Sequence, residues 1–491
     1  MAEKSSSNFN QALWLGIGQL CTFAIAFLSA PILSRYFDKV EYATYRQILY
    51  VYTSLQALFM MGLPNVFAYF IPRLSIGQQK TLVNKLTKLF LLIGACFSLA
   101  LYLTSDLIAN LLNNPELSTG IKIFSPFPLF TLPTMGVEGI YTALRRTKEI
   151  AIYQVFSKIM MFLCIVLPVV IWNTGYREAV IGWGVASFIT FLLAMYMKSA
   201  PYRNVEISVF SDLYRSVFRY SLPLMGAFIA GFFVNSADQF FISRYYGSSA
   251  FADFSNGCFN IPIIAMVAGS VRSVLVPLFS KAQTENRLSD AIESYGNAVF
   301  KMSIILLPII AYSFFYSKEI MVGLFGAQYV GSGDYFQYYL IRNFFDIFPY
   351  FAILMAFGFT SIYMKMHVWG AFFIWGADFL IVFLGQSSLL IVLISSIFQI
   401  MCVFVAFSYI KRKSGLSLLG KKIVRRVFFI LLQCFVTLIL LDCLWNSFFS
   451  QCNVYYFLFT TIIAYYVLLI FVGHLTKINY MEPIFILLKR K

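Results

Sequence analysis

Eight ionisable side chains interrupt apolar stretches that are long enough to cross a lipid bilayer. A charge at the centre of a bilayer costs about 3 kcal/mol unless it is paired or hydrated. Such residues are therefore the first candidates for a functional site, and pairing between helices is the competing explanation for each. The eight are Glu138, Lys158, Asp238, Arg272, Lys301, Arg342, Asp346 and Asp378.

Arg272 is the strongest candidate for binding a ligand. It lies in Ala268-Gly269-Ser270-Val271-Arg272-Ser273, where small neighbours leave space for a ligand or for another helix. A guanidinium group forks onto two phosphate oxygens, which suits it to a phosphate ligand. An interhelical ion pair or a side chain that reaches toward the membrane surface is the alternative.

Three further cations are candidates for binding a substrate. Arg342 stands four residues before Asp346, so the two share a helix face and neutralise each other in the simpler interpretation. Lys158 is within two turns of a predicted helix end, where reaching toward the membrane surface is the simpler interpretation. Arg35 belongs to a short polar turn after the first apolar stretch.

Four residues are candidates for ion coupling or gating. Asp238 and Asn235 are about one turn apart and point in one direction if the segment is helical. Asp378 is in the middle of an apolar run, and Glu138 is followed by Arg145, so structural pairing is favoured for Glu138. Protons or sodium ions would be the coupling species. The spacing of cysteines and of the two histidines predicts no metal site, and no cofactor is expected.

The composition is that of a polytopic membrane protein. Apolar residues make up 60% of the chain, charged residues make up 12% and the mean hydropathy is +0.77, whereas soluble domains are about 25% charged. Lipid-exposed backbone must satisfy its own hydrogen bonds, so the apolar runs predict an all-α protein of about fourteen spans. The predicted spans are 12–34, 48–72, 87–110, 121–144, 151–173, 179–198, 219–243, 253–279, 297–316, 336–361, 367–385, 388–409, 425–445 and 454–473.

Basic residues concentrate in one set of loops, which predicts that both termini are cytoplasmic. The net charge of +16 therefore reflects topology and contact with anionic membrane lipids rather than binding to nucleic acid. The predicted loops are short and leave no room for a soluble catalytic domain, so we expect a transporter and not an enzyme.

A short motif occurs twice. Ser34-Arg35-Tyr36 follows the first apolar helix, and Ser243-Arg244-Tyr245 follows the seventh. Six spans separate the copies, as expected for a duplicated bundle whose halves enter the membrane in the same direction. The sequence thus predicts a six-helix bundle over 1–215, a second over 216–410, and a basic loop with two extra helices and a tail over 411–491.

The first copy, with Tyr42-Ala43-Thr44-Tyr45 after it, resembles the first-loop signature of bacterial polysaccharide transporters. These are the O-antigen flippase group of the MATE-like multidrug/oligosaccharidyl-lipid/polysaccharide superfamily. Leu324-Phe325-Gly326-Ala327-Gln328-Tyr329 is similar to an outer motif of the same family.

The resemblance implies two pseudosymmetric bundles around a central cavity, alternating access, and location in the bacterial inner membrane. It implies that the substrate is an oligosaccharide linked to undecaprenyl pyrophosphate, namely a repeat unit of O-antigen, capsule or exopolysaccharide. The protein would move this substrate from the cytoplasmic to the outer leaflet. Related lipid II flippases have a cationic cavity with an arginine on helix eight, and Arg272 is the position here that matches. A polysaccharide polymerase and a chain-length regulator are expected partners.

Two other classes of function stay open. A cation-coupled drug exporter of the same fold would favour an acidic, aromatic cavity over a basic one. A membrane polysaccharide polymerase or ligase would carry a large outer loop with arginine and histidine chemistry, and the sequence has no such loop.

Overall fold

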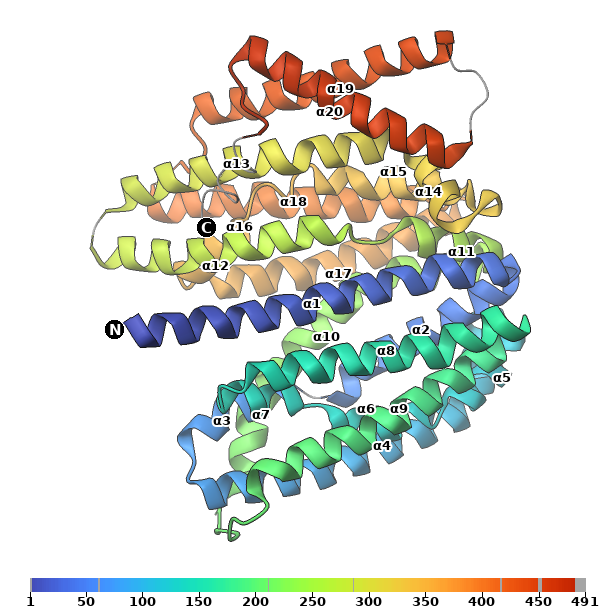
Figure 1. Ribbon diagram of the computed structural model, residues 1–491, viewed down its shortest axis with the longest axis vertical. Helices are drawn as coiled ribbons and strands as arrows, with labels where there is room; N and C mark the ends of the chain where they lie inside the picture. The colour runs from blue at the N-terminus through green and yellow to red at the C-terminus, as the bar shows by residue number, and fades with distance from the viewer. Residues whose placement is uncertain are drawn as a thin grey trace. The chain divides into compact units, whose positions relative to one another are not determined.

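The computed structural model describes residues 2–60, 62–210, 212–285, 287–415, 417–448 and 453–481. Every regular element in these ranges is a helix, as predicted (Figure 1). The chain divides into two compact units, Met1–Ala252 and Asp253–Lys491. The division into 1–215, 216–410 and 411–491 stays a prediction, and residues 482–491 of its last segment lie outside the described ranges.

Within the first unit, α8 packs against both α1 and α9, and α10 packs against α2. The elements are α1 (Ala2–Tyr36), α2 (Lys39–Met60), α3 (Pro64–Phe70), η1 (Ile71–Arg73), α4 (Ile76–Leu111), α5 (Glu116–Phe124), α6 (Phe127–Thr134), α7 (Val137–Ala143), α8 (Thr147–Trp172), α9 (Tyr176–Ser199), η2 (Ala200–Tyr202) and α10 (Leu213–Tyr245). Helix α11 (Gly247–Gly257) crosses the boundary between the units.

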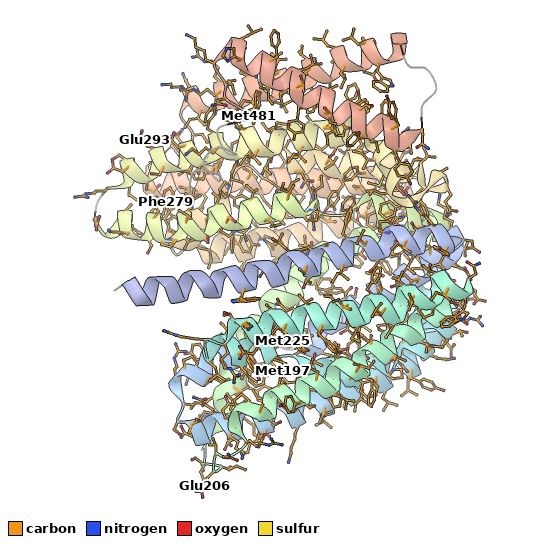
Figure 2. All side chains as sticks on the ribbon, viewed as in Figure 1. Met197, Glu206, Met225, Phe279, Glu293 and Met481 are labelled. Carbon is orange, nitrogen blue, oxygen red and sulfur yellow. The ribbon has the colours of Figure 1, made fainter. Side chains whose placement is uncertain are left out.

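Within the second unit, α13 packs against α19, α15 against α18, and α12 against α16. Its elements are α12 (Pro262–Thr284), α13 (Leu288–Phe315), α14 (Ser317–Phe325), η3 (Ala327–Tyr329), α15 (Ser332–Asn343), α16 (Tyr350–Ala356), α17 (Thr360–Phe383), α18 (Leu389–Ser414), α19 (Lys421–Phe448) and α20 (Val454–Thr476). Figure 2 shows the side chains on these helices, with Phe279 of α12 and Glu293 of α13 labelled.

The count of fourteen spans is not confirmed. In the described residues, ten helices are long and apolar enough to cross a membrane, or eleven if the bent pair Lys39–Met60 and Pro64–Arg73 is one span. The predicted span 121–144 is divided among α5, α6 and α7, and 336–361 is divided between α15 and α16. Proline explains these divisions, because it lacks an N–H group and clashes with the preceding turn of a helix.

The repeated motif marks the same structural boundary twice. Helix α1 ends at Tyr36 and α2 begins at Lys39, while α10 ends at Tyr245 and α11 begins at Gly247. The predicted sequence of apolar helix, short turn and second helix is therefore found in both copies.

Tyrosines after the first motif belong to the core. Tyr42, Tyr45 and Tyr52 are 0%, 5% and 7% exposed, and the Nε1–H of Trp183 donates to the Tyr45 hydroxyl at 2.9 Å. Their spacing on an amphipathic helix would also suit an interfacial belt, but burial shows that they pack the first unit.

A buried polar network joins α2 to α10. The Gln47 amide donates to Ser243 Oγ at 2.7 Å, and the Asn114 amide donates to Gln47 Oε1 at 2.5 Å and to Thr44 Oγ1 at 2.9 Å. All four side chains are buried. Buried polar groups are costly unless they are hydrogen-bonded, so these bonds fix how the helices meet.

Close packing of α8 and α9 depends on Gly182. A Cβ added there would collide with the Cys164 carbonyl group, whereas a Cβ at Gly184 would meet nothing within 4 Å. Small residues allow membrane helices to approach in this way.

We expect Gly182→Ala to lower the free energy of unfolding by about 1–3 kcal/mol, because the helices must separate or strain to admit the methyl group. Gly184→Ala is the matched control and should be neutral. Thermal unfolding of the purified variants in detergent measures the difference. Equal midpoints for the two variants would contradict the close approach.

Candidate functional site

Two of the predicted cations line one cavity of the second unit. We call this the arginine cavity, and its volume is about 220 Å³. It is bounded by α12, by α15 and the turn after it, and by α16, α17 and α18. The lining residues are Ala268, Arg272, Arg342, Phe345, Asp346, Phe348, Pro349, Tyr350, Phe351, Tyr363, Gln399 and Val403.

A break in a predicted span builds one wall of the cavity. Helix α15 ends at Asn343 and α16 begins at Tyr350, directly after Pro349. Short-range bonds hold the turn between them, including Phe345 N–H to the Arg342 carbonyl at 3.0 Å and Tyr350 N–H to the Phe348 carbonyl at 2.7 Å. Irregular backbone at membrane depth is tolerated where it is covered by protein or lines a water-filled cavity.

Aromatic rings position both guanidinium groups. The Arg342 group lies 3.7 Å from the centre of the Tyr339 ring, and the Arg272 group lies 5.5 Å from the centre of the Phe351 ring. Contacts of this kind stabilise a cation without neutralising its charge. The donors of both arginines are thus held in place while their charge stays available to an anion.

Asp346 lines the same cavity but does not form the expected ion pair with Arg342. Among the described residues, neither Arg272 nor Arg342 has a carboxylate oxygen within 4 Å. The Asp346 carboxylate instead accepts a hydrogen bond from the Asn343 amide at 2.7 Å. The lining therefore carries two positive charges and one negative charge, without direct neutralisation.

Polar aromatic and amide groups complete the lining. Tyr350, Tyr363 and Gln399 reach the cavity from α16, α17 and α18. The centre of the Tyr363 ring lies 4.5 Å from the centre of the Phe351 ring and 4.2 Å from the centre of the His367 ring. Fixed guanidinium, hydroxyl and amide groups in one cavity can bind a phosphate group together with a neighbouring polar group.

The sequence did not predict that Tyr350, Tyr363 and Gln399 line this cavity. Span 336–361 was expected to be one kinked helix, so the sequence placed no turn against Arg272. Pro349 was the available signal, because a proline at this depth predicts a break and a break at membrane depth predicts a cavity.

Two other predicted residues come together in the first unit. Glu138 on α7 accepts a hydrogen bond from the Gln154 amide at 2.9 Å, and not an ion pair from Arg145 as expected. Lys158 follows Gln154 by four residues on α8, so it is on the same helix face. Electrostatic interaction reaches from Glu138 to Lys158.

The remaining predicted residues are dispersed. Arg35 is exposed in the last turn of α1, and Asp238 is half-buried on α10. Asp378 is 0% exposed on α17. Neither Asp238 nor Asp378 lines the arginine cavity, and their role in coupling stays a prediction.

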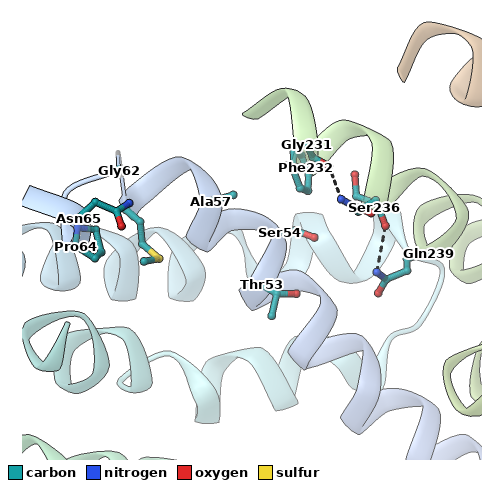
Figure 3. Close-up of a pocket in the computed structure, with 12 residues that line it drawn as sticks. Thr53, Ser54, Ala57, Gly62, Pro64, Asn65, Gly231, Phe232, Ser236 and Gln239 are labelled. Atoms are coloured by element: carbon teal, nitrogen blue, oxygen red, sulfur yellow. Dashed lines mark hydrogen bonds between the residues drawn. The ribbon is translucent and has the colours of Figure 1, made fainter. Parts of the chain in front are cut away.

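Asn235 lines a separate pocket of the first unit, which we call the amide pocket (Figure 3). Its volume is about 530 Å³. One wall comes from α2 and the start of α3, and the other from α10. The lining residues are Thr53, Ser54, Ala57, Met60, Gly62, Pro64, Asn65, Gly231, Phe232, Asn235, Ser236 and Gln239.

The fold and these cavities define a multi-pass helical membrane protein. The sequence profile of the polysaccharide biosynthesis protein family matches residues 9–283, which is more than half of the chain. The chain therefore belongs to this family, as the sequence motifs indicated.

The succinoglycan biosynthesis transport protein ExoT of Rhizobium meliloti (strain 1021) is 26% identical over 325 residues. The match covers 64% of this chain and 62% of that protein, so it spans less than two thirds of the relative.

Solved structures show which fold the chain adopts. The lipid II flippase MurJ in an inward closed conformation gives a TM-score of 0.73 at 14% identity, covering 94% of this chain and 99% of that chain. An inward-facing multidrug transporter of the MATE family gives a TM-score of 0.63 at 11% identity, and the match covers 82% of this chain and 98% of that chain. Both likenesses concern the fold alone.

We expect Asp346→Asn to bind inorganic pyrophosphate about three- to tenfold more tightly than the wild type, because it removes a negative charge near two guanidinium groups. Calorimetric titration of the purified protein in detergent measures the affinity. Asp334→Asn is the control, since Asp334 pairs with Lys318 at 3.0 Å outside the cavity. Weaker binding by Asp346→Asn would indicate that the carboxylate positions the arginines.

Proposed function

We propose that this protein is a flippase for lipid-linked oligosaccharide. Its substrate would carry an O-antigen, capsule or exopolysaccharide repeat unit on undecaprenyl pyrophosphate. The observation that carries the proposal is the arginine cavity. Arg272 and Arg342 line it, and among the described residues no carboxylate oxygen lies within 4 Å of either guanidinium group. Membership of the polysaccharide biosynthesis family supports the glycan part of the substrate.

The chemistry of the headgroup explains why a cavity is needed. A pyrophosphate group is strongly hydrated and cannot enter hydrocarbon alone. Two guanidinium groups replace that hydration with charge-assisted hydrogen bonds, and Tyr350, Tyr363 and Gln399 offer further polar contacts. The polyprenyl tail stays in the lipid while the headgroup and glycan cross.

Transport would follow alternating access, in which the cavity faces one side of the membrane at a time. Asp238 and Asp378 are our candidates for coupling the change to protons or sodium ions. Asp378 is on α17, which is long and apolar enough to cross a membrane, and Asp238 is on α10 in a stretch that the sequence predicts to span it. An unneeded carboxylate would be costly at such positions. Unchanged sensitivity of transport to both ion gradients after neutralising the two residues would exclude this coupling role.

The protein would reside in the bacterial inner membrane with both termini in the cytoplasm. The support is the excess of lysine and arginine at one set of helix ends and loops, above all in the last turn of α18 (Lys411, Arg412 and Lys413) and the first turn of α19 (Lys421 and Lys422). A polysaccharide polymerase and a chain-length regulator would receive the glycan at the outer leaflet.

We expect Arg272→Ala to reduce surface glycan by about tenfold or more and to accumulate lipid-linked oligosaccharide in the inner leaflet, because a charge-assisted bond to the headgroup is lost. Arg272→Lys should restore part of the transport, since it keeps the charge and loses the bidentate geometry. Surface glycan, leaflet-specific precursor and protein level in the membrane are measured together.

Arg425→Ala is the control, because Arg425 is an exposed arginine of the same unit outside the cavity. Wild-type glycan in both Arg272 variants would exclude Arg272 as the headgroup ligand. Precursor that accumulates only in the outer leaflet would overturn the flippase proposal and point to a polymerase or ligase.

A further inference from the structure

The amide pocket differs from the arginine cavity in its charge. None of its twelve described lining residues is ionisable, and its polar groups are hydroxyls and carboxamides (Figure 3). Strong phosphate sites usually include a cationic side chain, and Ca²⁺ and Mg²⁺ sites usually include carboxylates. The lining therefore suits an uncharged polar ligand.

Two carboxamides of α10 keep hydrogen-bonding capacity for such a ligand. The Asn235 amide donates to the Gly231 carbonyl at 2.7 Å, and the Gln239 amide donates to the Asn235 carbonyl at 3.4 Å. In the described part of the chain, neither side-chain carbonyl oxygen accepts a hydrogen bond. A carboxamide offers two donors and one acceptor oxygen, so each can still both donate and accept.

Ser236 supplies an independent indication of a ligand. Its side chain lines the pocket although the residue is only 3% exposed, and its hydroxyl has no hydrogen-bond partner among the described residues. A buried hydroxyl without a partner costs stability, so an unpaired one calls for an explanation such as an absent ligand. Figure 3 shows it on α10, opposite Thr53 and Ser54 of α2.

We propose that the amide pocket binds an uncharged sugar residue. Sugar hydroxyls donate and accept at once, which matches the carboxamides of Asn235 and Gln239 and the Ser236 hydroxyl. The apolar face of the sugar ring would rest on Phe232, which also lines the pocket. This inference rests on the proposed function, in which the sugar is part of the transported glycan.

Such a pocket would let the protein select its glycan. A site built to hydrogen-bond a hydroxyl strongly rejects an analogue that lacks it, because buried polar groups are then left unpaired. The pyrophosphate is common to all such precursors and cannot provide this selection.

The test measures binding of sugars that carry neither phosphate nor lipid. Saturation-transfer NMR of the purified full chain in detergent uses uncharged methyl glycosides of glucose, galactose, mannose, rhamnose and N-acetylglucosamine. We expect at least one to bind the wild type, and Gln239→Leu to weaken its binding about tenfold. Gln283→Leu is the control, because Gln283 is exposed at the end of α12 outside the pocket.

Ser236→Ala separates a binding role from a structural one. Removing a hydroxyl that has no partner should leave the thermal midpoint unchanged or raise it. Sugar binding should fall all the same, because the ligand loses its partner. A lowered midpoint with unchanged sugar binding would overturn the role given to Ser236.

The outcomes distinguish this inference from the flippase proposal. Arg272→Ala should lose pyrophosphate binding and keep glycoside binding. If no glycoside binds, or if Gln239→Leu binds as well as Gln283→Leu, the sugar site is wrong even where transport of the precursor is demonstrated. If glycosides bind through Gln239 but no precursor is flipped, the pocket stands and the transport proposal fails.

Discussion

The backbone hydrogen bonds that a membrane helix must make within itself decide where this chain can leave helical geometry. Lipid offers no partner to a freed N–H or carbonyl group, so a break must face protein or a polar cavity. One break separates Met60 from Pro64, bends the chain by 42° and borders the amide pocket. Another separates Asn343 from Tyr350 and borders the arginine cavity. Both cavities occur where proline interrupts a span, and side chains that are far apart in sequence converge there.

Charge follows the same constraint. Arg272 and Arg342 line the arginine cavity beside aromatic rings, and packing against Phe351 and Tyr339 fixes their direction. Away from the cavities, the buried amide of Gln47 is satisfied by neighbouring side chains in its polar network. A carboxylate within 4 Å of either arginine would stabilise the empty protein but weaken its hold on an anion. The absence of such a pair among the described residues is therefore what makes the cavity suitable for binding.

Sequence reasoning reached the helical class, the family and the repeated boundary at Tyr36 and Tyr245, because hydropathy and short motifs report local structure. It also named Arg272, since a charge inside an apolar run is visible in a sequence. It also listed Arg342 among the substrate-binding cations, but it did not find the turn before Pro349 that lines the cavity with both arginines, because this segment was expected to be a kinked helix. It could not find Gln239 or Ser236, because a neutral polar residue in an apolar run costs too little to stand out from residues that only pack. The count of fourteen spans is not confirmed for a similar reason, since composition does not reveal where a span divides into short helices.

Asp346 lines the arginine cavity, although a site that only had to bind an anion tightly would not need a carboxylate there. Without it, two guanidinium groups would hold a pyrophosphate more strongly, and a transporter that binds too tightly does not release its cargo. A carboxylate in the same cavity, which accepts a hydrogen bond from Asn343 at 2.7 Å, would lower the affinity for a pyrophosphate by repulsion without removing a donor. The uncharged amide pocket would then supply recognition through hydrogen bonds that individually contribute less than charge-assisted ones. If the protein is the flippase that we propose, it would gain selectivity from the glycan while its affinity for the headgroup stays low enough for release.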